Sequence, residues 1–159
     1  MKRIEILSGV AGILACGLVA VAIVPNAALA MGSSSKDSAS QEDPYKQAKK
    51  LIDDDQYSKA IPILQKLVKD KGAYADALNL LGYSYRKSGD QKSAMDYYNQ
   101  ALAMEPNHLG ANEYLGELYL EMKQPDEANQ RLAVLKTACG DCDEFQALSK
   151  AIEKYSAMN

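Results

Sequence analysis

Residues 78–106, which read LNLLGYSYRKSGDQKSAMDYYNQALAMEP, decide the fold of this chain. Apolar and aromatic side chains recur at spacings of three and four in the first part of this stretch and again in the second part, which predicts two helices. Ser88, Gly89 and Asp90 lie between them as a turn, and Asp90 is placed to cap the second helix. The stretch therefore predicts a helix pair.

This helix pair recurs with a period of 34 residues. The period divides the chain into three units at about residues 41–74, 75–108 and 109–142. We expect small side chains where the two helices of a pair cross, because larger ones would push the helix axes apart. Each unit has two such residues: Ala48 and Ala60, Gly82 and Ala94, and Gly116 and Ala128.

The pattern resembles the tetratricopeptide repeat (TPR) family, which has small residues at the eighth and twentieth repeat positions and a proline, here Pro106, at the thirty-second. The resemblance covers residues 41 to about 140 and implies an all-α fold, a right-handed superhelix of helix pairs. The chain departs from the family at Pro44 and Asn112, where tryptophan is frequent, and at Gly140, which replaces the late proline. Pro62 falls inside a predicted helix and should kink it.

A seventh helix is predicted after the third unit, at about residues 142–157. Phe145, Leu148, Ile152 and Tyr155 are spaced to form one apolar stripe on it. An open stack of helix pairs exposes its last apolar face, and a terminal helix with a polar outer side covers that face. We therefore expect a capping helix.

The first thirty residues have the pattern of an export signal. Lys2 and Arg3 precede an uncharged apolar run over residues 6–24, and the sequence Ala-Leu-Ala ends at Ala30. This pattern predicts cleavage after Ala30 and an exported, periplasmic protein.

Two alternatives concern the same segment. The apolar run is long enough to stay in the inner membrane as an uncleaved anchor. Residues 13–16 resemble a lipobox, which would make Cys16 a lipidated residue. Residues 31–43 are rich in serine and nearly free of large apolar side chains, so we expect a flexible lead there.

Composition limits the classes of function. Of the 159 residues, the 129 that follow the predicted signal suffice for one modest core, which excludes a large multidomain enzyme. The formal net charge is −3, and it becomes −4 when Lys2, Arg3 and Glu5 are removed with the signal. Nucleic acid is not an expected partner, because phosphate binding needs a basic surface.

The sequence offers little material for catalysis, so we predict no enzymatic activity, no cofactor and no metal. His108 is the single histidine, and we interpret it as a solvated loop residue because no second histidine can complete a metal site or triad. Asp53, Asp54 and Asp55 precede a predicted helix, and we interpret them as helix-capping residues rather than a cation site.

Cys139 and Cys142 are the two cysteines that would remain after export. Their spacing and position suit an intramolecular disulfide that fixes the angle of the capping helix. A reduced pair, a redox-active pair and a zinc site are the alternatives, although zinc would require four ligands.

The family resemblance also implies a binding surface, because the first helix of each repeat lines a concave groove in this family. In the first unit the matching residues are Tyr45, Lys49 and Asp53; in the second, Asn79, Tyr83, Arg86 and Lys87; in the third, Glu113, Glu117 and Glu121. With cations in the middle and acids in the third unit, the expected partner is an extended or helical protein segment with basic character toward the third unit. A solvated face without a partner is the alternative.

We therefore expect an exported protein–protein interaction module, and the resemblance implies that it serves as a scaffold or adaptor in envelope assembly. A self-associating structural repeat is one alternative, with a homo-oligomer as the product. The other is a thiol–disulfide helper that uses Cys139 and Cys142.

Overall fold

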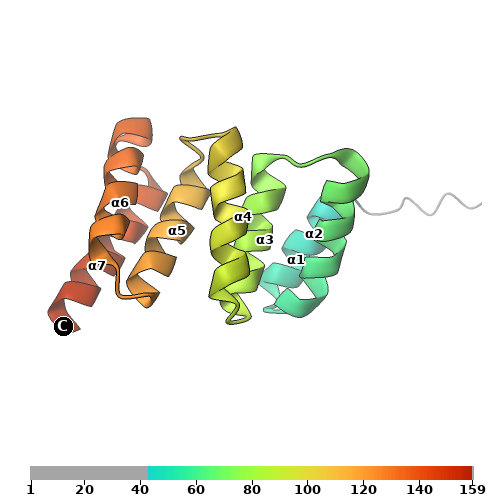
Figure 1. Cartoon of the computed structure of the whole chain (residues 1–159), viewed down its shortest axis with the longest axis horizontal. Helices are drawn as coiled ribbons and strands as arrows, with labels where there is room; N and C mark the ends of the chain where they lie inside the picture. Colours follow the sequence, from blue (N-terminus) through green and yellow to red (C-terminus); the bar gives the residue numbers. More distant parts are fainter. Residues whose placement is uncertain (1–42, 159) are drawn as a thin grey trace, which may run out of the picture. The chain divides into compact units, whose positions relative to one another are not determined.

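The computed structural model describes residues 43–158, and the chain forms seven helices and no strands within that range. They are α1 (Pro44–Asp53), α2 (Tyr57–Lys71), α3 (Ala75–Lys87), α4 (Gln91–Met104), α5 (Leu109–Glu121), α6 (Pro125–Cys139) and α7 (Asp143–Met158). The first six form three consecutive helix pairs, and α7 packs at the end of the stack (Figure 1). The predicted all-α helical-repeat fold with a terminal helix is confirmed.

Helix starts follow from local capping. Asp43 accepts a hydrogen bond from the Tyr45 backbone N–H at 3.1 Å, with Pro44 at the first helical position, where its missing N–H is harmless. Asp90 accepts from the Ser93 backbone N–H at 3.0 Å and so caps α4 as predicted.

Pro62 lies inside α2 without interrupting it. The helix runs from Tyr57 to Lys71. Pro62 cannot donate a backbone hydrogen bond to the Ser58 carbonyl, but both residues are exposed, so water can reach this carbonyl. The expected absence of a break is confirmed, while the kink remains a prediction.

The helix pairs stack so that the first helices of successive pairs lie closer together than the second helices do. Successive first helices contact each other, α1 with α3, α3 with α5, and α5 with α7. Within residues 43–158 the second helices α2, α4 and α6 make no such contacts with one another. The side formed by α1, α3, α5 and α7 is therefore the inner face of the stack.

Buried side chains join neighbouring pairs rather than filling each pair separately. Leu81 of α3 packs with Leu64 and Leu67 of α2, and Leu115 of α5 packs with Tyr98 of α4. Burial of such side chains stabilises each by about 1.5–3 kcal/mol, so interfaces between units hold the stack together.

The small residues at the predicted helix crossings are all buried. A Cβ on Gly82 would lie 2.5 Å from Tyr98 Cδ1, which places the close approach within the α3–α4 pair. Gly116 differs from the expectation, because a Cβ there would lie 2.5 Å from Leu148 Cδ2 of α7. The closest steric limit at Gly116 is thus the capping helix.

The predicted signal peptide, its cleavage after Ala30, the lipobox at Cys16 and most of the lead over 31–43 lie outside the described residues. Among the helices of residues 43–158, none combines the length and the apolar content that crossing a bilayer requires.

Candidate partner-binding face

Two hollows open on the inner face. The first, which we call the tyrosine pocket, has a volume of about 370 Å³ and lies where α1 ends beside α3 and α5. Its polar lining consists of Lys49, Asp53, Asp55, Tyr57, Tyr83 and Tyr114.

Three tyrosine rings form the wall of the tyrosine pocket. The Tyr57 and Tyr83 ring centroids are 6.0 Å apart, and those of Tyr83 and Tyr114 are 4.8 Å apart. The Tyr57 hydroxyl donates to the Asp55 carboxylate, and this hydrogen bond raises the pKa of Tyr57 to about 12. Burial raises the pKa of Tyr114 to about 12 as well. Both phenols are therefore neutral at physiological pH.

The second hollow, which we call the C-terminal pocket, has a volume of about 400 Å³. It lies between the end of α3, the last turn of α5 and helix α7. Its charged lining residues are Arg86, Lys87, Glu117, Glu121 and Lys154. The capping helix is thus part of the candidate binding face and not only a cover for the core.

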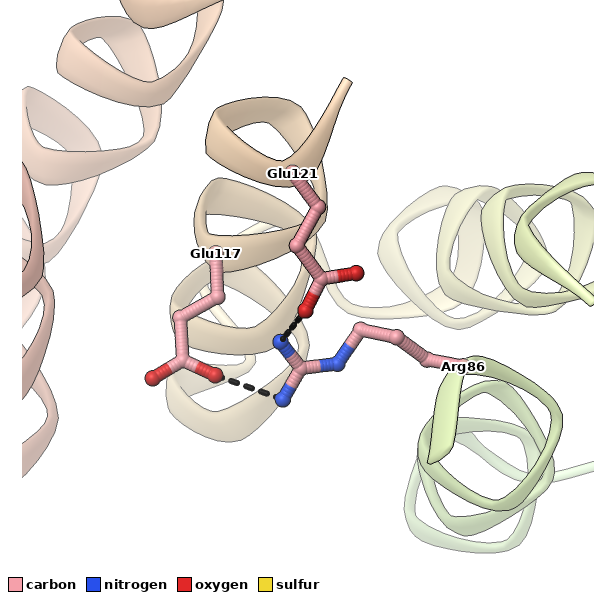
Figure 2. Close-up of polar contacts among 3 residues, drawn as sticks. All are labelled: Arg86, Glu117 and Glu121. Carbon is pink, nitrogen blue, oxygen red and sulfur yellow. Dashed lines mark hydrogen bonds and ion pairs between the residues drawn. The ribbon is translucent and has the colours of Figure 1, made fainter. Parts of the chain in front are cut away.

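Arg86, which lines the C-terminal pocket, extends from α3 to two glutamates of α5 (Figure 2). Its Nη2 lies 2.5 Å from Glu117 Oε2, and its Nη1 lies 3.1 Å from Glu121 Oε1. The Arg86 side chain is only 6% exposed. Arg86 is therefore not the free groove cation that the sequence suggested, because both of its terminal nitrogens bind carboxylates of the third unit.

Aromatic rings hold the same guanidinium from the side. The Arg86 guanidinium carbon lies 5.7 Å from the ring centroids of both Tyr83 and Tyr114. The Lys87 ammonium lies 5.9 Å from the Tyr83 ring. These are cation–π distances, so the rings help to hold the Arg86 side chain in place.

The acidity of the third unit is consequently much reduced. Glu117 and Glu121 share the charge of Arg86. Burial, followed by repulsion from Glu117 and Glu144, raises the pKa of Glu113 to about 7. The third unit is therefore less negative than its three glutamates suggest, because two of them share one cation and burial disfavours the charge of the third.

Tyr45 and Asn79 were also predicted to line the groove, and neither is among the lining residues of the tyrosine pocket or the C-terminal pocket. The Tyr45 ring packs 5.9 Å from that of Tyr74. Asn79 is 7% exposed, and its amide packs against Gly110 at the α3–α5 contact. Asn79 thus serves the packing of the repeat.

Sequence reasoning missed several lining residues. Tyr57, Tyr114 and Asp55 complete the tyrosine pocket, and Lys154 and Met158 line the C-terminal pocket. Tyr114 directly follows Glu113, which the resemblance had assigned to the groove, so its aromatic character beside a groove position was the available signal.

His108 corrects another expectation, since it is not a solvated loop residue. Its Nδ1 accepts from the Ala111 backbone N–H at 3.1 Å and caps α5, and its Nε2 lies 3.1 Å from Asp76 Oδ1. The His108 side chain is only 11% exposed.

The three consecutive aspartates do not cap the following helix either. Asp53 ends α1, Asp54 follows as its C-cap, and Asp55 takes a left-handed backbone conformation with φ of 57°. Residue 56 stands at the start of α2 without a side-chain cap. No metal-binding group of three or more suitable side chains occurs in residues 43–158.

Cys139 and Cys142 form the predicted disulfide, with the sulfur atoms 2.03 Å apart. The bond joins the end of α6 to the residue before α7, next to Gly140 with φ of 76°. It therefore restrains the turn that sets the direction of the capping helix.

Comparison with known proteins supports one family. A model of tetratricopeptide repeats matches residues 45–108, and a second such model matches residues 85–152. No curated protein sequence matches the chain significantly.

Solved structures show the same fold. A tetratricopeptide repeat protein from Parabacteroides merdae aligns with a TM-score of 0.62 at 16% identity, over 72% of this chain and 45% of that one. The TPR domain of P58(IPK) aligns with a TM-score of 0.63 at 21% identity, over 72% of this chain and 32% of that one. The type III secretion translocator chaperone SycD from Yersinia enterocolitica aligns with a TM-score of 0.61 at 19% identity, over 72% and 87%.

This chain spans less than half the length of the first two of these structures. The two family models together cover residues 45–152, which contain all three helix pairs and most of α7. A repeat stack with an open inner face is a module for protein–protein interaction. The chain belongs to the tetratricopeptide repeat family.

Proposed function

We propose that this chain is an exported adaptor that holds a segment of another protein along its inner face, in the assembly of the bacterial envelope. The observation that carries the proposal is the position of the two hollows. Both are lined mainly by first helices of the pairs and by α7, and together they reach from the end of α1 to the end of α7. A partner segment bound across them would contact every unit of the stack.

The chemistry of this face favours recognition over catalysis. Tyrosine side chains supply large contact areas with a hydrogen-bonding end, and they lose little conformational entropy on binding. Charged side chains at the rims supply specificity and register.

Export rests on residues 1–30. Fusion of these residues to a reporter that is active only outside the cytoplasm should give activity, and the mature protein should begin at Met31 by mass spectrometry. An unshortened chain in the membrane fraction would support the anchor, and a lipid adduct on Cys16 would support the lipoprotein.

Binding is tested by photo-crosslinking in cells with an aromatic photoreactive residue at position 83. Tyr83 lines the tyrosine pocket and is partly exposed, so the probe replaces one aromatic ring with another. The control position is Gln100, an exposed residue of α4 on the other side of the stack. A discrete adduct from position 83 alone supports the proposal, whereas equal adducts from both positions contradict it.

Self-association is the second candidate, favoured by a hollow of about 600 Å³ beside the first pair. Ile63 and Leu67 line it between Pro44 and Lys71. A crosslinked adduct of twice the mass of the chain, with a solution mass that rises with concentration, would favour this candidate.

A further inference from the structure

The two hollows of the inner face carry opposite charge. Asp53 and Asp55 contribute two carboxylates to the tyrosine pocket and Lys49 one cation, which leaves one net negative charge. The C-terminal pocket has three cations, from Arg86, Lys87 and Lys154, against the carboxylates of Glu117 and Glu121, which leaves one net positive charge. The charge therefore runs from negative near α1 to positive near α7.

This direction is opposite to the one that the sequence suggested. The sequence places glutamates in the third unit and cations in the second, but Arg86 closes the gap between them and binds two of the glutamates. Of the exposed carboxylates beside the two hollows, Glu121 binds Arg86 at the C-terminal pocket, whereas Asp53 and Asp55 line the tyrosine pocket at the other end of the face.

The tyrosine pocket has a second feature that suits a cation. Its walls are the rings of Tyr57, Tyr83 and Tyr114, and the electron-rich faces of such rings attract ammonium and guanidinium groups. Tyr83 and Tyr114 already have this relation to Arg86, at 5.7 Å from each ring, and the Lys87 ammonium lies 5.9 Å from the Tyr83 ring, so the Tyr57 ring is the one without such a cation contact among these three. Arg86 adds little repulsion against a second cation, because two carboxylates neutralise it.

Resting on the proposed function, we propose that the bound segment places an arginine or lysine side chain in the tyrosine pocket, with its acidic side chains toward α7. The cation would contact the tyrosine rings and pair with the carboxylates of Asp53 and Asp55. The Asp55 carboxylate is already oriented by the hydroxyl of Tyr57. The basic end of the partner therefore lies at the first unit and not at the third.

A selection from a random dodecapeptide library tests this assignment. The mature chain from Met31 is captured through a tag at its N-terminus, because Met158 at the other end lines the C-terminal pocket. Selected peptides are then measured against the wild type, the double variant Asp53→Asn/Asp55→Asn and the control Asp96→Asn/Asp126→Asn. The control removes the same charge from exposed positions on α4 and α6.

Both double variants should fold as the wild type does. Asp53 and Asp55 are exposed, and asparagine tolerates the left-handed conformation of residue 55 well. Matching circular dichroism spectra and melting temperatures establish this before binding is compared.

We expect the selected peptides to share a basic residue and to bind Asp53→Asn/Asp55→Asn about tenfold more weakly, while Asp96→Asn/Asp126→Asn binds within about twofold of the wild type. Replacing the basic residue of the peptide with glutamine should weaken binding to the wild type by a similar factor. The same replacement should hardly change the affinity of the peptide for Asp53→Asn/Asp55→Asn, because this variant has already lost the charge pairing.

Two results would overturn the assignment in different ways. The charge direction is refuted if the selected peptides bind the inner face without a basic residue. It is also refuted if replacing the basic residue weakens binding to both double variants by the same factor. Either result leaves the adaptor proposal intact. If every selected peptide is insensitive to substitutions in both pockets, including Tyr83→Ala and Lys154→Gln, the adaptor proposal fails as well.

Discussion

A methyl group at position 82 tests the packing that defines this repeat. A Cβ built on Gly82 of α3 would lie 2.5 Å from Tyr98 Cδ1 and 2.6 Å from Tyr98 Cε1 of α4. Carbon atoms pack at about 3.5–4.0 Å, so Gly82→Ala forces the ring or a helix to move by about 1 Å. The Tyr98 ring has no exposed surface and cannot swing into solvent.

Two effects of opposite sign decide the stability of Gly82→Ala. Alanine is better than glycine in a helix interior by about 1 kcal/mol. Overpacking of a close-packed core typically lowers the free energy of unfolding by about 1–3 kcal/mol. We expect the steric effect to win, because the obstructing atoms belong to a buried ring. The net loss should be about 1 kcal/mol, measured by urea unfolding followed by circular dichroism.

Making the same substitution in the variant Tyr98→Leu separates the steric effect from the helix-propensity effect. With Tyr98→Leu the ring is absent, and Gly82→Ala should then stabilise the chain by up to about 1 kcal/mol. The matched control is Gly89→Ala, where φ is 87° and nothing lies within 4 Å of the added Cβ. Backbone strain should destabilise that variant by about 1 kcal/mol in both backgrounds. Equal effects of Gly82→Ala with and without the Tyr98 ring would refute this reasoning.

Three further predictions concern the polar groups and the disulfide. Arg86→Met should lower the free energy of unfolding by about 2 kcal/mol, because two charge-assisted hydrogen bonds are lost. Lys87 is exposed, so Lys87→Met should change this free energy by less than about 0.5 kcal/mol. Equal losses for the two variants in urea titrations would contradict the burial of Arg86. The folded-state pKa of Glu113, about 7, lies above the ordinary carboxyl value of 4.5. Its unfavourable contribution is therefore absent below pH 4.5, grows as the pH rises and is complete above pH 7. Glu113→Gln should accordingly stabilise the chain most at about pH 8 and hardly at about pH 4, and a pH-independent difference in melting temperature would argue against this. Cys142→Ser should lower stability by at most about 2 kcal/mol, because the disulfide closes a very short loop, and should speed amide exchange in α7 before α1; unchanged exchange in α7 would contradict its restraining role.

The fold could be predicted because the helix crossings admit only small residues. Their 34-residue spacing placed the second and third units at residues 75 and 109, which are the residues where α3 and α5 begin. The neighbour of Gly116 could not be predicted in the same way. Leu148 reaches it only because α7 packs against α5, and the angle of that last helix is not part of the repeat.

The candidate site was less predictable because it depends on pairing between units. The sequence shows Arg86, Glu117 and Glu121, but their separations of 31 and 35 residues do not say whether the charges face solvent or each other. The spacing of α3 and α5 and the burial beside Tyr114 decide this. His108 was misjudged for a related reason, since Asp76 lies 32 residues away and reaches the imidazole only in the folded stack.

The central claim is that a partner segment lies along the inner face, and hydrogen–deuterium exchange of the chain with and without a bound segment tests it most directly. The segment can be the crosslinked partner or a selected peptide. Protection should rise in α1, α3, α5 and the last turns of α7, and stay unchanged in α4 and α6 outside their contacts with these helices. Protection confined to α2 and the start of α1, around Leu67 and Pro44, would place the interface at the end of the stack and contradict the account.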